Sequence, residues 1–405
     1  KNNLWKATSS RVTARSLEEL GKITPQNLRD YKQVAKCIEC FSCIAACPIV
    51  KEVWSSEFAG PAMMVLLART ALNPRDKGRK AEIAYFEGLY NCTTCAKCSE
   101  VCPKDIAIPA STIEKLRSLA VETGLGPLHE HRQVAALIMD TGKSVTRAST
   151  TFLEEVNGEV FRVNDPQDSV GFFVGCLADY RLQDVPRSVL NILARNHVEV
   201  VTPKKQICCG SVLIRTGQLK CLEKLVKANL DAFSKFNVQK VVTACAGCSS
   251  TLKNNYPSLV KEFEMEMPFK VYHLSEYLVN VLDIQNDGVK RVETKVTFHD
   301  PCHLKRGQGI FHEPRRLLRT VPGVELIEMR EADRCCGAGG GVRSGRRELS
   351  LKVGSRKVEF IKETGAEAVI TECPFCVLQL EDVVRQAGLN TKVMYLEELL
   401  NRAYR

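Results

Sequence analysis

The sequence contains no run of about 18 uncharged apolar residues, the length that a membrane-spanning helix needs. It has no recognisable secretory signal peptide and no flavin-binding fingerprint. Aromatic residues make up only 6% of the chain, and the lysines and arginines behind its net charge of +10 are scattered, which argues against a nucleic-acid partner. These absences exclude a transmembrane span and favour a cytoplasmic protein, peripheral at the membrane only through a partner.

Cysteine, in contrast, is abundant, with 19 residues in a chain of 405. Secreted disulfide-rich proteins reach this density only in short chains. Dense C-x2-C spacing in a long chain instead indicates metal or redox chemistry in a reducing compartment. The length allows two to four domains, and a hydrophobic content of 44% is typical of a globular protein.

Eight of the cysteines form two copies of the spacing C-x2-C-x2-C-x3-C-P. In two-cluster ferredoxins the first three thiolates of such a run bind one [4Fe–4S] cubane and the fourth binds the other cluster. We therefore predict two cubane clusters, the first on Cys37, Cys40, Cys43 and Cys102, and the second on Cys92, Cys95, Cys98 and Cys47. A zinc site or a disulfide framework would have to produce this spacing twice by accident, prolines included.

The 44 residues between Cys47 and Cys92 exceed what a minimal ferredoxin has. Their apolar residues recur at helical spacing, so we expect Met63, Met64, Leu66 and Leu67 to form helix core rather than a cofactor site. This region resembles the helical ferredoxin domain of succinate dehydrogenase-type iron–sulfur subunits. Residues 1–35 are polar, with one helix-like piece at 16–23, and are expected to form an arm over that domain.

The later cysteines form an internal duplication. Cys176, Cys208-Cys209-Gly210 and Cys245-x2-Cys248 recur as Cys302, Cys335-Cys336-Gly337 and Cys373-x2-Cys376. The offsets between matching cysteines are 126, 127, 127, 128 and 128 residues. Two five-cysteine sets with nearly constant spacing between matching members indicate that each copy builds the same site.

Each copy alternates strand-like and helix-like segments, which predicts parallel sheets in two α/β lobes. The expected strands are residues 169–176, 197–203 and 240–245 in the first copy, and 295–302, 323–329 and 368–373 in the second. The cysteines come at or after the carboxyl ends of these strands, where open α/β sheets bind ligands. Five thiols are therefore expected to converge at one edge of each lobe.

Five cysteines exceed the four ligands of a cubane, and adjacent ones such as Cys208 and Cys209 do not easily reach one small face. They suit an extended cluster with more than one ligated iron. The glycines that follow, at 210 and 337–341, allow the main chain to approach inorganic sulfide closely. A phosphate-binding loop is disfavoured because the glycine run follows cysteines rather than opening a helix after a strand.

At these residues (GC, CCG and CAGC, then DPCHL, CCGAGGG and CPFC) the sequence resembles the catalytic subunits of heterodisulfide reductases, above all the D-type subunit, which joins a ferredoxin domain to two cysteine-rich CCG domains. The resemblance implies a noncubane [4Fe–4S] cluster in each CCG domain, the two facing each other across the disulfide of coenzyme M and coenzyme B. It also implies that electrons enter through the cubanes and that the disulfide is split symmetrically into two thiols.

These coenzymes carry sulfonate, carboxylate and phosphate groups, so basic residues near the CCG cysteines are candidate anion contacts. Any one of them has an equal chance of being an ordinary solvated side chain. The candidates are Arg181, Lys205, Lys305, Arg306, Arg334 and Arg343. His303 could donate a proton, although a hydrogen bond to the Cys302 thiolate is favoured. His129 and His131 are expected to be solvated, and Cys221 to be a buried filler.

Three alternatives stay open. The iron–sulfur subunit of thiol:fumarate reductase is related, and carries an extra N-terminal [2Fe–2S] domain that would lie upstream of Lys1. An iron–sulfur component of a glycolate, lactate or glycerol-3-phosphate oxidation complex would only relay electrons. A zinc-binding structural or nucleic-acid module is disfavoured. Because the chain lacks a flavin fingerprint, each redox function requires an electron partner, a membrane cytochrome b or a flavoprotein or hydrogenase subunit.

The predicted fold is therefore α+β and multidomain. A helical two-cluster ferredoxin domain is followed by two duplicated α/β, Rossmann-like CCG lobes. The expected bounds are an arm at 1–35, the ferredoxin domain at 36–125, a connector at 126–168, the first CCG domain at 169–290 and the second at 291–405.

Overall fold

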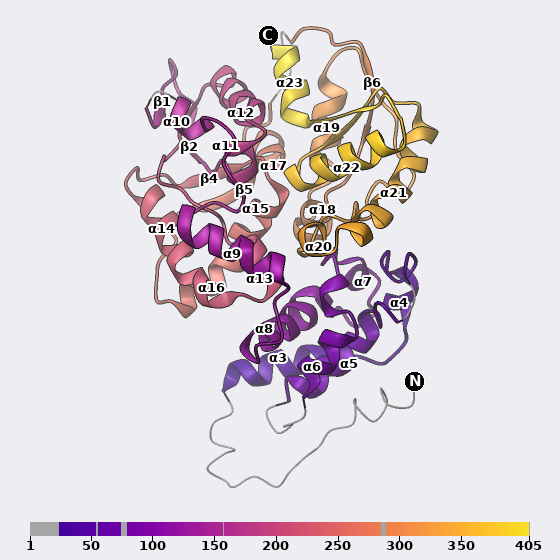
Figure 1. Ribbon diagram of the computed structural model, residues 1–405. Helices are drawn as coiled ribbons and strands as arrows, with labels where there is room; N and C mark the ends of the chain where they lie inside the picture. Colours follow the sequence, from indigo (N-terminus) through magenta and orange to yellow (C-terminus); the bar gives the residue numbers. More distant parts are fainter. Residues whose placement is uncertain (1–23, 54–55, 74–78, 157, 285–288, 405) are drawn as a thin grey trace. The chain divides into compact units, whose positions relative to one another are not determined.

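The computed structural model describes residues 24–53, 56–73, 79–156, 158–284 and 289–404 (Figure 1). The chain divides into two compact units. The ferredoxin-containing unit comprises the described residues up to Arg132 together with Val212–Leu219 and Gly337–Val353. The CCG unit comprises Gln133–Ser211, Lys220–Cys336 and Gly354–Arg405. The helix predicted at residues 16–23 lies outside the described residues. None of the described helices is long and apolar enough to cross a membrane.

Short helices make up the ferredoxin-containing unit. They are α3 (Pro25–Ala35), α4 (Ser42–Ala46), α5 (Pro61–Ala71), α6 (Lys80–Phe86), η1 (Leu89–Asn91), α7 (Lys97–Glu100), η2 (Pro109–Ile113), α8 (Glu114–Glu122) and α20 (Val342–Gly345). Helix α5 is apolar on nearly all sides, as expected of a central helix. Met64, Leu66 and Leu67 on it are buried and Met63 is partly exposed, which largely confirms the expected helix core.

The first CCG lobe is a five-stranded sheet in the order β1-β3-β2-β4-β5. Its strands are β1 (Val160–Phe161), β2 (Asp168–Phe172), β3 (Val198–Val201), β4 (Lys240–Thr243) and β5 (Lys270–His273). All pairs are parallel except β1 with β3, and Val170 pairs with Val200 while Gly171 pairs with Val241. The helices of this lobe are α10 (Phe152–Glu155), α11 (Cys176–Tyr180), α12 (Asp184–Arg195), α14 (Leu222–Ser234), α15 (Ala246–Ser250), η4 (Thr251–Asn255), α16 (Tyr256–Glu262) and α17 (Leu274–Asn280). The residues of α9 (His129–Thr141), α13 (Ser211–Thr216) and η3 (Leu219–Cys221) are divided between the two units.

The second lobe is an all-parallel sheet in the order β7-β6-β8-β9, which repeats the order β3-β2-β4-β5 of the first. Its strands are β6 (Thr294–Phe298), β7 (Val324–Leu326), β8 (Ala368–Thr371) and β9 (Lys392–Tyr395). Its helices are α18 (Cys302–Gln308), α19 (Glu313–Thr320), α21 (Arg347–Thr364), α22 (Pro374–Gln386) and α23 (Leu396–Tyr404). The six predicted strands and the internal duplication are thus confirmed, and so is the predicted fold class.

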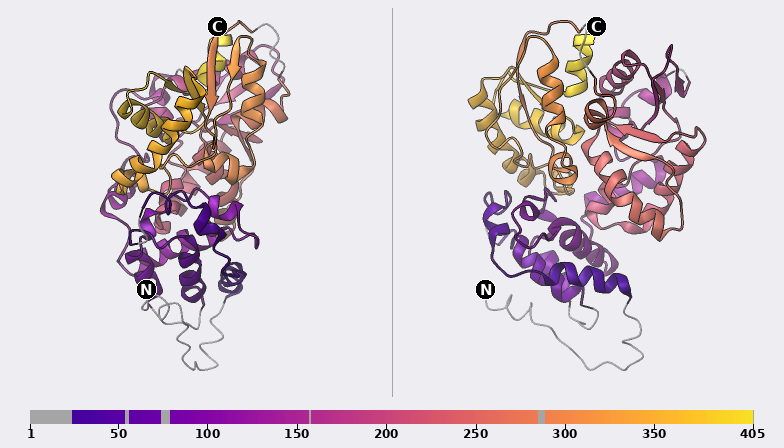
Figure 2. Two further views of the ribbon diagram at one scale, coloured as in Figure 1. Left: turned by 90° about the vertical axis from the view of Figure 1, so that its right-hand side faces the viewer. Right: turned by 180° about the vertical axis from the view of Figure 1, so that it is seen from behind.

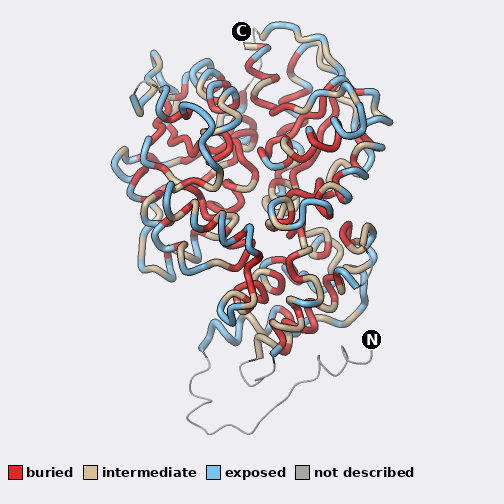
Figure 3. Tube along the Cα trace, in the orientation of Figure 1, coloured by how far each residue is buried: buried red, intermediate tan, exposed pale blue. Residues whose placement is uncertain are grey.

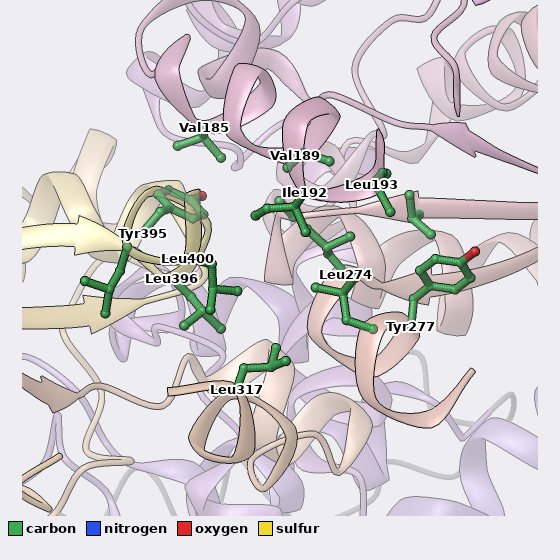
Figure 4. Close-up of a cluster of buried hydrophobic side chains, with 14 of the residues drawn as sticks. Val185, Val189, Ile192, Leu193, Leu274, Tyr277, Leu317, Tyr395, Leu396 and Leu400 are labelled. Carbon is green, nitrogen blue, oxygen red and sulfur yellow. The ribbon is translucent and has the colours of Figure 1, made fainter. Parts of the chain in front are cut away.

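Both sheets are covered by helices, and buried residues concentrate along the strands (Figures 2 and 3). One apolar core is shared by the two lobes of the CCG unit. It contains Ile192 from α12 and Leu400 from α23, which lie among the apolar side chains of Figure 4. Helix α12 packs on α23, and α17 packs on α19. Because α12 corresponds to α19 and α17 to α23 in the duplication, the lobes exchange equivalent contacts and form one body.

Candidate iron–sulfur sites

Two residues of each ferredoxin motif adopt the left-handed backbone conformation. Glu39 and Phe41 have φ of 60°, and Thr94 and Ala96, at the same places in the second motif, have φ of 53° and 60°. This conformation costs about 1–2 kcal/mol for residues other than glycine, and such strain gathers at functional sites. The Thr94 N–H also donates to Cys92 Sγ over 3.4 Å. The repeated strain indicates that both motifs wrap their thiols in the same way.

The eight ferredoxin cysteines line two separate pockets. One pocket is lined by Cys37, Cys40, Cys43 and Cys102, with Ile106 and Ile108 among its apolar side chains. The other is lined by Cys47, Cys92, Cys95 and Cys98, with Phe58 and Ile113 among its neighbours. In each pocket three cysteines of one motif are thus joined by the last cysteine of the other. This is the crossed grouping that the ferredoxin spacing predicts.

The chemistry of these pockets fits iron–sulfur clusters. All 19 cysteines are free thiols. Burial raises the pKa of Cys43 to about 11, of Cys92 to about 11 and of Cys47 to about 12, because an apolar pocket disfavours the thiolate. Four soft sulfur donors without a carboxylate among the pocket-lining residues of the second site are the donor set that an iron–sulfur cluster prefers. A bound metal would remove the protons that burial retains.

In the first CCG lobe, sheet topology brings the five cysteines together. Strand β2 lies between β3 and β4, so the loops after these three strands meet at one edge of the sheet. Cys176 opens α11 after β2, Cys208 and Cys209 follow β3, and Cys245 and Cys248 follow β4. The thiols in this set are close enough for neighbours to shift the pKa, that of Cys176 through Cys208, those of Cys208 and Cys209 through each other, and that of Cys248 through Cys209 and Cys245.

This network separates the thiols electrostatically. The neighbouring thiols of Cys208 and Cys248 lower the pKa of Cys209, while the neighbouring thiols of Cys209 and Cys245, together with burial, raise the pKa of Cys248. The main chain also supports the sulfurs: Gly210 N–H donates to Cys208 Sγ over 3.4 Å, and Cys248 N–H to Cys245 Sγ over 3.3 Å. A buried cage of five thiols that favours at least one thiolate is suited to bind iron.

The second lobe repeats the arrangement with one addition. Cys302 is the first residue of α18, which follows β6, and Cys335 and Cys336 follow β7. After β8, Cys373 immediately precedes α22, and Cys376 lies in that helix. Cys336 Sγ lies 3.5 Å from Cys376 Sγ. His299, Cys336 and Cys376 form a buried group whose nitrogen and sulfur atoms lie within 4.8 Å of one another. No sequence pattern had singled out His299, although its place three residues before Cys302 at a strand end was available as a signal.

The loops of the two cysteine sets are in direct contact. The N–H of Ala246, next to Cys245, donates to the carbonyl oxygen of Glu372, next to Cys373, over 3.0 Å. Gln308 Nε2 donates to Ser249 Oγ over 2.8 Å, and Asn254 Nδ2 to the Gly307 oxygen over 2.8 Å. These bonds join α15 and η4 of the first lobe to α18 and to the segment between β8 and α22 of the second. The two thiol cages are therefore neighbours within one body.

Comparison with known proteins finds iron–sulfur and cysteine-rich domains in the same parts of the chain. The family described as a cysteine-rich domain (CCG) matches residues 170–253 and 296–381, and the 4Fe-4S dicluster domain family matches residues 33–106. Over 384 residues the chain is 44% identical to the B-type subunit of fumarate reductase (CoM/CoB) from Methanothermobacter marburgensis, covering 95% of this chain and 75% of that protein. Over 372 residues it is 32% identical to the D-type subunit of dihydromethanophenazine:CoB–CoM heterodisulfide reductase from Methanosarcina mazei, covering 86% and 89%.

The chain belongs to the heterodisulfide reductase/thiol:fumarate reductase family. It is thus an iron–sulfur oxidoreductase subunit, and its relatives' names as subunits imply partner chains. A solved structure of a hypothetical protein from Helicobacter pylori shares the fold, with a TM-score of 0.59 at 11% identity over 95% of this chain and 74% of that one.

The candidate anion contacts of this family member differ in their surroundings. Lys305 Nζ lies 3.4 Å from Asp333 Oδ2, which also accepts from Arg306 Nη2 over 2.6 Å. Arg334 Nη1 donates to Glu331 Oε2 over 3.0 Å, and Arg181 Nη2 to the Thr146 oxygen over 3.0 Å. Lys205 is exposed, and Arg343 belongs to the ferredoxin-containing unit. His303 Nδ1 lies 3.6 Å from Cys302 Sγ, as the favoured interpretation expects.

Two other expectations need correction. His131 is buried rather than solvated, and its Nε2 lies 2.9 Å from the Gly341 oxygen. Its neighbours Tyr90 and Gly341 come from distant segments, which no local pattern reveals. Cys221 is only partly buried, because it stands at the N-terminal cap of α14 rather than on the helix's inner face.

Two loop-holding residues also escaped the sequence analysis. Asn229 Nδ2 donates to the Cys208 oxygen over 3.1 Å, and its Oδ1 accepts from the Ile207 N–H. Lys357, which follows Asn229 by the same 128 residues as the paired cysteines, donates to the Glu331 and Ala332 oxygens over 2.8 and 3.1 Å. Burial lowers the pKa of Lys357 to about 8. Each side chain fixes the segment that leads to a double cysteine.

Proposed function

We propose that this protein reduces the heterodisulfide of coenzyme M and coenzyme B to two thiols between paired noncubane [4Fe–4S] clusters in the CCG lobes. The observation that carries this proposal is the direct contact between the two cysteine loops through Ala246 and Glu372. A disulfide has two sulfur atoms, and two neighbouring sites of the same kind suit one sulfur each. The overall reaction takes up two electrons and two protons for each disulfide that is cleaved.

The proposed ligands follow from the two kinds of site. The cubane ligands are Cys37, Cys40, Cys43 and Cys102 for one cluster, and Cys47, Cys92, Cys95 and Cys98 for the other. The noncubane ligands are Cys176, Cys208, Cys209, Cys245 and Cys248, and Cys302, Cys335, Cys336, Cys373 and Cys376. When bound, the clusters supply one-electron transfer and iron with affinity for substrate sulfur.

The remaining tasks fall to the protein's own side chains. Lys305 and Arg306 stand on α18, the helix that Cys302 opens, and are suited to orient an anionic coenzyme tail. Their contacts with Asp333, and that of Lys305 with Asp300 over 4.0 Å, hold them in place. His303 Nδ1, beside Cys302 Sγ, can hold a proton for a product thiol. An electron-donor chain, either a membrane cytochrome b or a flavoprotein or hydrogenase subunit, completes the system.

A second candidate runs the same chemistry in the opposite direction. Here the two thiols would be oxidised to the disulfide, with release of two protons, and the two electrons would be passed to a flavoprotein that reduces fumarate. The observation in its favour is the 44% identity to the fumarate reductase (CoM/CoB) relative, against 32% to the heterodisulfide reductase relative. Both candidates use the same paired site and differ in the partner.

The test uses anaerobically purified, iron-replete protein. Reduced viologen is the electron donor and the coenzyme M–coenzyme B disulfide is the acceptor, with simple symmetric disulfides for comparison. We expect fast viologen oxidation selective for the mixed disulfide, lost in Cys336→Ser and retained in the control Cys221→Ser. Viologen oxidation that the disulfide does not accelerate, with iron content intact, would contradict the proposal and leave an electron relay. Coupling the same protein to a fumarate-reducing flavoprotein, with the two thiols as donor, tests the second candidate.

A further inference from the structure

Arg117 on α8 is a fully buried arginine that donates only to main-chain oxygens. Its Nε and Nη2 donate to the Leu89 oxygen over 3.3 and 2.9 Å, and Nη2 also donates to the Cys92 oxygen over 2.8 Å. Its Nη1 donates to the Arg215 and Gly340 oxygens over 2.5 and 2.9 Å. Five hydrogen bonds use the full donor capacity of a guanidinium.

The acceptors come from three segments that are far apart in the sequence. Cys92 is a proposed ligand of the second cubane. Arg215 follows the double cysteine of the first lobe by six residues, and Gly340 follows that of the second lobe by four. Both segments leave the CCG unit and complete the ferredoxin-containing unit. Arg117 thus forms hydrogen bonds both to the second cubane site and to the two segments that follow the double cysteines.

Neighbouring contacts show that this junction is tightly built. Tyr90 Oη donates to the Thr216 oxygen over 3.2 Å, and its ring centroid lies 4.9 Å from the Arg117 guanidinium carbon. Gly340 has a φ of 62°, and a Cβ there would stand 2.4 Å from the Cys92 oxygen. At Gly217, with a φ of 84°, a Cβ would stand 2.4 Å from the Arg117 carbonyl carbon. The segments approach so closely that side chains are excluded between them.

The charge of Arg117 is also unusual. In the described part of the chain no carboxylate contacts its guanidinium, and the nearby Glu114 pairs with Arg215 instead. Burial lowers the pKa of Arg117, and the neighbouring Cys92 raises it. An isolated buried cation is costly unless a negative group compensates it. A thiolate-ligated cluster on Cys92 is a negative group at that place.

We propose that Arg117 is a positioning residue that fixes the Cys92 end of the second cubane site to the two double-cysteine segments, and that its charge raises the reduction potential of the cluster held there. Reduction adds one negative charge to the cluster, and a nearby buried cation stabilises that charge strongly because screening is weak. The proposal rests on the proposed function only in requiring the cubane on Cys47, Cys92, Cys95 and Cys98.

The experiment is a redox titration of anaerobic full-length protein, followed by the paramagnetic resonance of the reduced cubanes. Arg117→Gln removes the charge, and Arg117→Lys keeps it with fewer donors. Lys115→Gln is the matched control, because Lys115 is on the same helix but partly exposed and paired with Asp30 over 2.9 Å. We expect Arg117→Gln to make reduction of one cubane at least tenfold less favourable, a fall in potential of about 59 mV. The other cubane and the control should keep their potentials.

Limited proteolysis provides a second readout that needs no enzyme activity. Arg117→Lys keeps the positive charge. It should therefore change the reduction equilibrium of the cubane on Cys92 by less than about threefold relative to wild type, which corresponds to about 30 mV for one electron. It should also expose residues 211–219 and 337–353 to cleavage, because three donors cannot hold five bonds. Unchanged potential in Arg117→Gln with full iron content would overturn the electrostatic role, and unchanged cleavage in both variants would overturn the positioning role. Loss of iron in both variants, with the control loaded, would reduce Arg117 to a folding residue and overturn the proposal.

These outcomes are distinguishable from failure of the proposed function. If wild-type protein binds both cubanes but cleaves no disulfide, the proposed function fails and the titration still decides the role of Arg117. If the cubane potentials are the same in Arg117→Gln as in wild type while the wild-type protein cleaves the disulfide normally, only the proposed role of Arg117 fails.

Discussion

At the scale of single residues, the most informative buried carboxyl is Glu397 on α23. It is 1% exposed, and neither carboxyl oxygen has a hydrogen-bond partner among the described residues. Burial raises its pKa from 4.5 to about 8. Since the folded pKa lies above the unfolded value, the folded protein binds the proton more tightly. The contribution of Glu397 protonation to the free energy of unfolding is therefore complete below pH 4.5 and is lost as the pH rises to about 8.

The variant Glu397→Gln removes this titration while keeping the neutral shape. Relative to wild type, we expect its free energy of unfolding to gain about 1.4 kcal/mol for each pH unit within that window. Urea unfolding at several pH values measures this difference. Glu359→Gln, an exposed carboxyl paired with Arg356, should show almost no pH-dependent difference. Parallel stability curves for wild type and Glu397→Gln would contradict a protonated Glu397.

The crossed grouping of the ferredoxin cysteines makes a second prediction at this scale. Cys102→Ala should remove the same cluster signal as Cys37→Ala, because both line one pocket. Cys47→Ala should instead match Cys92→Ala, which belongs to the other pocket. Resonance spectra of the reduced variants and iron analysis measure this, with Cys221→Ala as the control that keeps all iron. Pairing of Cys47 with Cys37 in these spectra would refute the crossed ligands.

At the scale of elements, the surroundings of the glycines after Cys336 allow a prediction that their sequence alone does not. Gly340 and Gly365 have nearly the same left-handed φ, 62° and 60°, but only Gly340 is crowded, by the Cys92 oxygen at 2.4 Å. A Cβ at Gly365 meets nothing within 4 Å. Gly365→Ala should therefore cost only the conformational strain, about 1–2 kcal/mol.

Gly340→Ala carries the same strain and a main-chain clash in addition. We expect it to destabilise the protein by clearly more than Gly365→Ala and to alter the resonance of the cubane that includes Cys92. Thermal unfolding and spectra of both variants make the comparison. Equal destabilisation with an unchanged cubane signal would show that the segment can move away from Cys92.

At the scale of the whole molecule, the shared core makes the two CCG lobes one body. Ile192 of the first lobe and Leu400 of the second are both buried in that core. Ile192→Ala should cost about 2–5 kcal/mol. Because the core is common, hydrogen exchange should quicken in β2 of the first lobe and in β6 of the second.

Leu67→Ala is the matched control for that experiment, since Leu67 is buried in the separate core of the ferredoxin-containing unit. It should quicken exchange in α5 and leave β2 and β6 unchanged. Faster exchange confined to the first lobe in Ile192→Ala would mean that the lobes are stabilised independently and that their loops need not stay paired.

The sequence by itself determined the iron–sulfur character, the duplicated lobes and the strands that end near each cysteine group. These features follow from local spacing and from a repeat that is visible without a structure. The edge strands β1, β5 and β9 were missed, because β1 has only two residues and because β5 and β9 run directly into α17 and α23 with no turn residue to mark where the strand ends. Only the tertiary structure placed His299 beside Cys336, buried His131 and gathered five main-chain bonds on Arg117. Such contacts join residues separated by tens to hundreds of positions, and chain packing alone decides which of them meet.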